Sequence, residues 1–270
     1  MIPFVREKYP MVYIEHARIE VDDSSIKVIN SDGTINSLPV ALLATVMLGP
    51  GTNITHEATK VIASVNCLLC YVGADGLFYY AVGISPTHDM LNARKQVIMA
   101  TDDIKRTEIV RRMYSIRFPG IKLEGKSIQE MMGMEGIRVR NSYAEYANKY
   151  HVDWRGRKIT VGNVGSDDIT NRAFTICNGL LYSIVTTAIY HTGYLPQIGF
   201  VHTSGNVPFA YDIADLYKTK ISMHIAFSLT EALNRKFDHK LVIDTFRDIV
   251  VGNNLMETVV SDIMKIMENM

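Results

Sequence analysis

The change in hydrophobic period near residue 84 does most to limit what this chain can fold into. Before it, apolar residues alternate with polar ones in short runs, such as residues 11–21. These runs end at turn sequences, among them NSDG at 30–33 and GPG at 49–51, which is the pattern of short β-strands. Farther on, the apolar residues recur at helical spacing, and residues 88–117 contain neither glycine nor proline. We therefore predict strands first and helices afterwards.

Capping signals mark where several of the helices begin and end. Thr55 is placed as the N-cap of a short helix, and Ser127 with Glu130 forms a capping box for a longer one. The Asp-Asp pair at 167–168 caps a long helix that Gly193 ends. These signals predict separate helices rather than one continuous helical rod.

Chain length allows two domains, since 270 residues exceed what one small domain needs. The fold class that we predict is α+β. A small N-terminal β-rich domain covers residues 1–84, and a larger all-α domain covers residues 85–270. Within the second domain we expect helices over 209–218, 221–237 and 241–270.

Cysteine content and hydropathy favour a cytoplasmic protein. Three cysteines cannot pair evenly, and Cys67 and Cys70 lie in the apolar run VNCLLCYV, which favours buried core thiols over a metal or redox site. The first residues show no charged leader, and the longest apolar runs fall short of the roughly 20 residues that span a bilayer. We therefore expect a reduced, cytoplasmic protein without a membrane partner.

Charge is unevenly distributed, although the chain balances 28 Lys and Arg against 28 Asp and Glu. Residues 86–157 hold 14 basic and 9 acidic side chains, a net charge of +5, while the flanking segments are net negative. A local basic band follows a phosphate backbone even when the whole protein is neutral. A solvated helix face explains the same composition, and the sequence leaves the two interpretations open.

His202, Asp212 and Asp215 form the strongest chemical signal, in the stretch GFVHTSGNVPFAYDIADLYK. On a helix the two aspartates share one face, where like charges repel unless a cation lies between them. Glu135 lies on another expected helix, and Glu, His and Asp are ligand types for a divalent cation that keeps open positions for a substrate. A solvated polar face with a hydrogen-bonded histidine is the alternative, and spacing alone does not separate the two.

Four segments carry a resemblance to a known family: MLGPGTNITHEA, LLCYVGADGLFYYAVG, GMEGIRVRNSYA and GFVHTSGNVPFAYDIADLYK. In their order and spacing the chain resembles the CRISPR-associated integrase-endonuclease of spacer acquisition, in its type I-E form. The resemblance implies that residues 1–84 mediate dimerisation and that residues 85–270 form the catalytic domain. It also implies a homodimer, with a small CRISPR-associated partner protein bridging two such dimers.

The resemblance further implies which residues carry the chemistry. Glu135, His202 and Asp215 match the family's metal ligands, for Mg²⁺ or Mn²⁺, and Asp212 matches a nearby acidic member of the catalytic group. The substrate is double-stranded DNA, both the captured fragment and the CRISPR repeat. Side chains expected to contact DNA, from the resemblance or from the basic segment, are His16, Lys60, Arg111, Arg112, Arg138 and Tyr182.

Several of these DNA contacts have structural alternatives. His16 is otherwise an exposed strand residue, and Tyr182 a half-buried core residue. Arg138 either meets a phosphate or forms an ion pair with a glutamate on its own helix. Arg111 and Arg112 either contact the DNA backbone or face the dimer partner.

The function predicted from these features is metal-dependent integration of short DNA fragments into the CRISPR repeat array. A 3′-hydroxyl attacks a phosphodiester, so no serine or cysteine nucleophile is required. Two alternatives remain: a structure-selective repair nuclease acting on branched DNA, and a non-catalytic scaffold that binds DNA ends. Strand transfer and hydrolysis differ only in the attacking oxygen, so the first alternative would use the same site.

Overall fold

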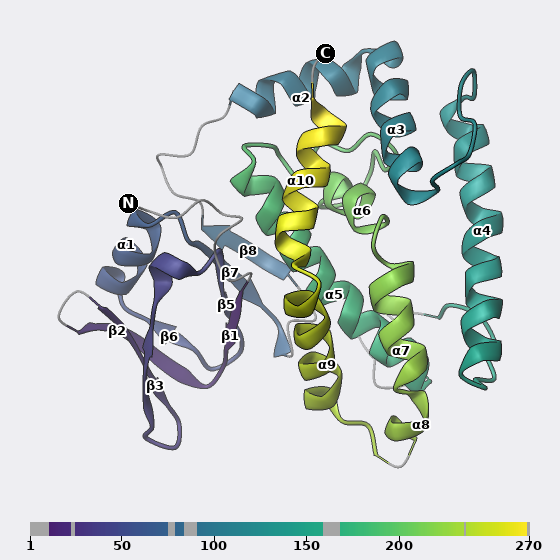
Figure 1. The fold of residues 1–270 in the computed structure, drawn as a ribbon. Helices are drawn as coiled ribbons and strands as arrows, with labels where there is room; N and C mark the ends of the chain where they lie inside the picture. The colour runs from purple at the N-terminus through teal and green to yellow at the C-terminus, as the bar shows by residue number, and fades with distance from the viewer. Residues whose placement is uncertain are drawn as a thin grey trace.

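The computed structural model describes residues 11–22, 25–74, 79–83, 91–158, 168–234 and 236–268. Figure 1 shows a strand-rich N-terminal part, purple to blue, lying beside a larger group of helices. The predicted α+β class, with strands first, is confirmed. The domain boundary that we expect near residue 84 falls within 84–90, outside the described residues.

Two four-stranded sheets make up the N-terminal part, in the orders β1-β5-β7-β8 and β4-β3-β2-β6. In the first sheet β1, β5 and β7 run parallel and β8 antiparallel; in the second, only the β2–β6 pair is parallel. The predicted turn at 30–33 joins β3 to β4, with Gly33 at φ 85°. The bounds are β1 (Val12–Ile14), β2 (Ala17–Asp22), β3 (Ser25–Asn30), β4 (Ile35–Leu38), β5 (Thr45–Leu48), β6 (Asn53–Ile54), β7 (Leu68–Val72) and β8 (Tyr79–Gly83).

The alternating segment 11–21 is not one strand but two, in different sheets. The chain turns at His16, which has a φ of 48°. Ile14 and Ala17 are both buried, and residues three apart cannot share one face of a single strand. The change of phase between them is the sequence signal of the break. Both sheets pack with α1 (His56–Ser64) into one core.

The remaining chain is helical, apart from loops, over the described residues. The expected helical segment 88–117 breaks at Asp102, whose carboxylate accepts from the backbone N–H groups of Ile104 and Lys105 at 3.0 Å each and so starts a new helix. The bounds are α2 (Leu91–Thr101), α3 (Asp103–Arg117), α4 (Ile128–Lys149), α5 (Ile169–His191), α6 (Pro208–Ala214), a π-helical turn (Thr219–Met223), α7 (His224–Ser228), α8 (Thr230–Leu233), α9 (His239–Gly252) and α10 (Leu255–Met267).

Helix α5 runs through the centre of the helical part (Figure 1) and packs on α6, α7, α9 and α10. Its predicted N-cap is confirmed at Asp168, which accepts from the Asn171 N–H at 2.9 Å; position 167 lies outside the described residues. Its end at Gly193, with φ 77°, is also confirmed. By length and composition α5 could span a membrane, but 83% of its apolar window is buried inside the protein. It is the core helix of this fold.

Helix α4 lies at the edge of the molecule (Figure 1). Its predicted capping box, Ser127 with Glu130, is confirmed. Met131 is its one fully buried residue, although the helix has 22 residues. The rest of its packing comes from partly buried apolar side chains, both aliphatic and aromatic, including Tyr143 stacked on Trp154 at 4.9 Å between centroids. The helix is therefore attached through a small number of contacts.

A buried hydroxyl pair joins β5 to α5 and can be tested directly. Thr45 donates to the hydroxyl of Thr187 over 2.8 Å, and Thr187 donates onward to the carbonyl of Ser183. Thr187→Val leaves the Thr45 hydroxyl without its acceptor, so we expect it to lower the free energy of unfolding by about 1–3 kcal/mol.

Adding Thr45→Val removes the hydroxyl that the first substitution leaves unpaired. The double variant should therefore lose less stability than the two single variants together, by about 1 kcal/mol. Denaturant unfolding of the wild type and the variants measures this coupling. Strict additivity would show that the two hydroxyls do not interact.

Candidate functional site

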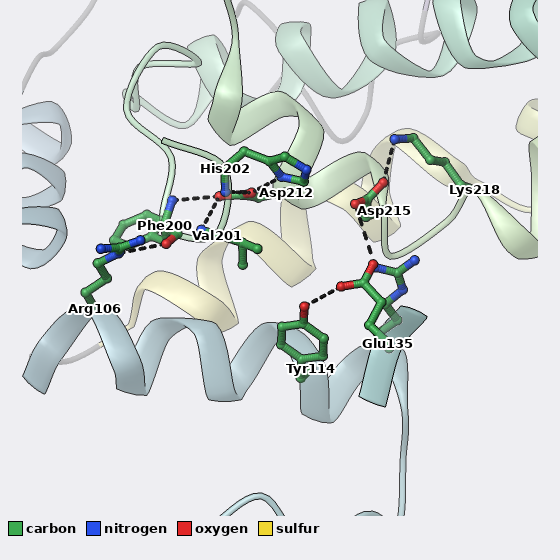
Figure 2. A network of polar contacts seen from close by, with 10 residues as sticks. Arg106, Tyr114, Glu135, Phe200, Val201, His202, Asp212, Asp215 and Lys218 are labelled. Atoms are coloured by element: carbon green, nitrogen blue, oxygen red, sulfur yellow. Dashed lines mark hydrogen bonds and ion pairs between the residues drawn. The ribbon is translucent and has the colours of Figure 1, made fainter. Parts of the chain in front are cut away.

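The carboxylate of Asp212, on α6, organises the loop that carries His202. Its side chain is fully buried. One oxygen accepts from the backbone N–H of Phe200 at 2.7 Å and of Val201 at 3.1 Å. The other accepts from the backbone N–H of His202 at 2.9 Å and bonds the Nδ1 atom of its ring at 2.7 Å (Figure 2). Both oxygens are thereby used within the protein.

The local sequence explains why the loop can close so tightly over Asp212. A Cβ atom on Gly199 would lie 2.2 Å from the carbonyl oxygen of His202, so only glycine fits. On the other side, Arg106 of α3 donates from Nε to the Phe200 carbonyl at 2.7 Å. The ring of Phe200 packs edge-on against Phe209 of α6. The loop is held by α3 and α6 together.

His202 is consequently oriented before any ligand arrives. With Nδ1 bonded to Asp212, Nε2 is the ring nitrogen left for another partner, and the side chain is 41% exposed. The hydrogen bond to Asp212 raises the pKa of His202, while burial acts in the opposite direction. A histidine fixed by a carboxylate through its other nitrogen is the usual arrangement of metal-binding histidines.

Glu135 and Asp215 approach each other from α4 and from the end of α6, and both contact Arg117. Glu135 pairs with Arg117 through one oxygen and accepts a hydrogen bond from the Tyr114 hydroxyl through the other. Asp215 lies 3.7 Å from the same arginine nitrogen and 2.5 Å from Nζ of Lys218. Burial lowers the pKa of Lys218, but Asp215 and Tyr182 together raise it by more, so the net shift is upward. Arg117 therefore contacts both carboxylates, and Lys218 contacts Asp215 alone.

The three predicted ligands surround one small pocket, although they come from α4, a loop and α6. Within the described residues, however, no three His, Cys, Asp or Glu side chains are grouped as ligands of one ion. Arg117 contacts both Glu135 and Asp215. Their role as metal ligands stays a prediction. The pocket is lined by Met113, Tyr114, Arg117, Glu135, Val201, His202, Asp212, Asp215 and Leu216.

Asp212 and Asp215 do not share one role, although they lie one helical turn apart. Asp215 contacts Arg117 and Lys218, whereas Asp212 bonds the backbone N–H groups of the loop and the His202 ring. The predicted catalytic role of Asp212 stays a prediction, and its bonded oxygens favour a positioning role that acts through His202.

The predicted DNA-contacting residues on α1 and α3 are engaged in ion pairs. Lys60 pairs with Glu57 at 3.3 Å on the exposed face of α1. Arg111 and Arg112 both pair with Glu108. Arg112 also donates to the carbonyls of Ile266 and Glu268, at 3.1 and 2.6 Å, and so ties α3 to the end of α10. DNA contact by these side chains stays a prediction, and it would compete with these bonds.

The other predicted DNA contacts lie in three different places. His16 is exposed at the turn between the two sheets. Arg138 is exposed on α4, with its guanidinium 4.8 Å from the centre of the Phe118 ring, and it forms no ion pair with another described residue. Tyr182 lies beside the pocket, with Nζ of Lys218 4.8 Å above its ring. Their contact with DNA also stays a prediction.

Sequence reasoning missed four residues of this site: Arg106, Tyr114, Arg117 and Lys218. The last was within reach, because Asp215 and Lys218 are an i,i+3 pair in the stretch quoted above. Tyr114 and Arg117 are also three apart, on one face of α3, but no motif singles them out. Arg106 and Arg117 belong to the basic segment 86–157, so part of its charge is used inside the protein.

Comparison with known proteins identifies the family. The family described as CRISPR associated protein Cas1 matches residues 11–122 and 115–243. The CRISPR-associated endonuclease Cas1 2 of Chlorobaculum tepidum is 45% identical, over 98% of this chain and 90% of its own length. The CRISPR-associated endonuclease Cas1 of Escherichia coli is 33% identical, over 83% and 74%. The crystal structure of a TtCas1–DNA complex superposes with a TM-score of 0.77 at 33% identity, covering 99% of this chain and 100% of that one. The chain therefore belongs to the Cas1 family of CRISPR-associated proteins, as its sequence motifs predicted.

Proposed function

We propose that this chain is a metal-dependent DNA integrase and endonuclease of CRISPR adaptation, of the type I-E form. It inserts short DNA fragments into the repeat array by transesterification. The observation that carries the proposal is the convergence of Glu135, His202 and Asp215 on one pocket. Further support comes from relatives named endonucleases and from a 33% identical protein solved in complex with DNA.

The donor set of the pocket fits a divalent cation. Two carboxylates and an imidazole suit Mg²⁺ or Mn²⁺, and the carboxylates already attract two positive charges, on Arg117 and Lys218. Glu135, Asp215 and the Nε2 atom of His202 would hold the ion. When bound, such an ion lowers the pKa of an attacking hydroxyl and stabilises a leaving oxyanion.

The protein's own residues orient the reacting groups. In strand transfer the 3′-hydroxyl of the fragment forms a bond to phosphorus while the bond from phosphorus to the repeat's 3′-oxygen breaks, and in hydrolysis water replaces the hydroxyl. Asp212 fixes the His202 ring, and Lys218 places a positive charge beside Asp215. No thiol takes part, because the cysteines are buried and burial raises the pKa of Cys70 to about 12.

The proposal extends to the assembly. The chain acts as a homodimer through its strand-rich part, and a small CRISPR-associated protein bridges two dimers. Captured fragment and CRISPR repeat are both double-stranded DNA. His16, Lys60 and Arg138 are exposed, which makes them the most accessible of the proposed DNA contacts.

Loss of any one proposed ligand should abolish strand transfer. Glu135→Gln, His202→Ala and Asp215→Asn each remove one donor from the same ion, so we expect large losses rather than graded ones. The assay is integration of a short duplex with free 3′-hydroxyls into a plasmid that carries the repeat. Glu145→Gln, an exposed acidic position on the same helix as Glu135, is the matched control and should retain activity.

The same assay separates the alternatives. Near-normal activity in one variant would remove that residue from the ligand set. Cleavage of branched DNA without integration by the wild type would favour a repair nuclease. Binding of DNA ends with neither activity would favour a scaffold.

Asp212→Asn should destabilise the protein as well as reduce activity. An amide offers one acceptor oxygen where the carboxylate has two, and it turns a donor toward the buried N–H groups of the loop. We expect the free energy of unfolding to fall by about 1–3 kcal/mol. His202→Ala removes a half-exposed ring and keeps the loop bonds, so it should cost clearly less. Thermal and denaturant melts of both variants test this, and a wild-type melting curve for Asp212→Asn would refute the positioning role.

Removal of divalent ions should abolish strand transfer. Restoring Mn²⁺ should recover activity at a lower concentration than Mg²⁺, because Mg²⁺ prefers an all-oxygen shell and Mn²⁺ accepts imidazole nitrogen more readily. Titration of each ion into chelator-treated protein measures the two midpoints. Full activity in excess chelator would contradict metal dependence.

A further inference from the structure

Arg117 occupies the space between the two carboxylates of the pocket. Its guanidinium pairs with one oxygen of Glu135 and lies 3.7 Å from an oxygen of Asp215, both through Nη1. The side chain is only 10% exposed. It is also the last residue of α3, so it joins α3, α4 and the end of α6 in one contact.

The constant charge of a guanidinium keeps Arg117 paired with the two acids in the metal-free protein. Arginine stays charged at all ordinary pH values, and its planar fork matches carboxylate oxygens. Glu135 and Asp215 both contact the same nitrogen of Arg117, so the two carboxylates are close enough to repel each other when no cation lies between them. A divalent cation bound by both acids would compete with Arg117 for their oxygens, because the other oxygen of each acid is bonded by Tyr114 or Lys218. It would also repel the guanidinium. The two cations are therefore alternatives for the same position.

We propose that Arg117 is the internal counter-cation of this site: it holds Glu135 and Asp215 in the metal-free protein and leaves when a divalent cation binds. This inference rests on the metal site of the proposed function. It gives Arg117 a positioning role, since it keeps the two acids together while no ion is present. It also sets the metal affinity, because every binding event must break its contacts.

Departure of Arg117 breaks more than its contacts with the two acids. The residue ends α3, and its guanidinium also lies 5.3 Å from the centre of the Phe118 ring. Glu135 is carried by α4, whose one fully buried residue is Met131. The Tyr114 hydroxyl holds the second oxygen of Glu135 from the same face of α3, and it keeps that acid at the pocket when Arg117 departs.

Direct metal binding tests the proposal without reference to activity. Arg117→Met keeps an unbranched apolar stem and removes the charged guanidinium, so the competing cation is lost. The Kd for Mn²⁺ should fall by about tenfold or more, and tenfold corresponds to about 1.4 kcal/mol. Electron paramagnetic resonance of free Mn²⁺, titrated with the full chain, measures the Kd. The metal-free variant should also melt at a lower temperature than the wild type, and added Mn²⁺ should raise its melting temperature by more, because Glu135 has lost its ion-pair partner.

Arg111→Met is the matched control, since Arg111 lies on the same helix and pairs with Glu108 instead of a proposed ligand. Its Kd for Mn²⁺ should equal that of the wild type. Arg117→Lys serves if the methionine variant does not fold. Lysine keeps the positive charge on one nitrogen and lacks the planar fork of a guanidinium. The Kd of Arg117→Lys for Mn²⁺ should therefore lie between those of the wild type and the neutral variant.

The outcomes separate this inference from the proposed function. An unchanged or higher Kd in the Arg117 variants, with binding still abolished by Glu135→Gln, would overturn the role of Arg117 and leave the metal site intact. Equal Mn²⁺ binding by the wild type and Glu135→Gln would overturn the metal site itself, and the role of Arg117 with it.

Discussion

The site depends first on the buried carboxylate of Asp212. A buried charge is tolerated only where its oxygens are fully bonded, and here three consecutive backbone N–H groups and a ring nitrogen supply those bonds. The carboxylate therefore fixes the backbone of residues 200–202, and its bond to the ring fixes the orientation of His202. Gly199 is required by the same closure. One aspartate thus determines the loop and the histidine at once.

The two halves of the pocket differ in how firmly they are held. The loop that carries His202 is bonded to α6 through Asp212 and to α3 through Arg106. Glu135 lies on α4, which is attached at the edge of the molecule. Its carboxylate is held at the pocket by Tyr114 and Arg117, which both belong to α3. Helix α3 is consequently the element that aligns the two halves, and the distance between the acids depends on how α4 lies against it.

Local rules predicted much of the fold, and sequence motifs indicated the acidic and histidine residues that line the pocket, but not the contacts that connect them. The capping box at Ser127 and the helix end at Gly193 follow from neighbouring residues, and both are confirmed. His202 and Asp215 could be paired because they share one stretch. Asp212 shows the same spacing whether it faces the pocket or the loop, so only the fold reveals its role. Arg117 was beyond prediction because its contacts exist only where α3, α4 and α6 meet.

The basic segment shows why a charge count does not translate directly into a DNA-binding surface. Its net charge of +5 suggested either a phosphate-binding band or a solvated face, but several of its arginines have a third use. Arg106 and Arg112 donate to backbone carbonyls, and Arg117 faces two acids. A guanidinium held in this way contributes to internal bonding, and it would have to break these bonds to contact a phosphate. The charge open to DNA is therefore smaller than the count, and it includes exposed side chains of α4 such as Arg138 and Arg140. Any DNA that contacts these residues would therefore bind the same helix that carries Glu135.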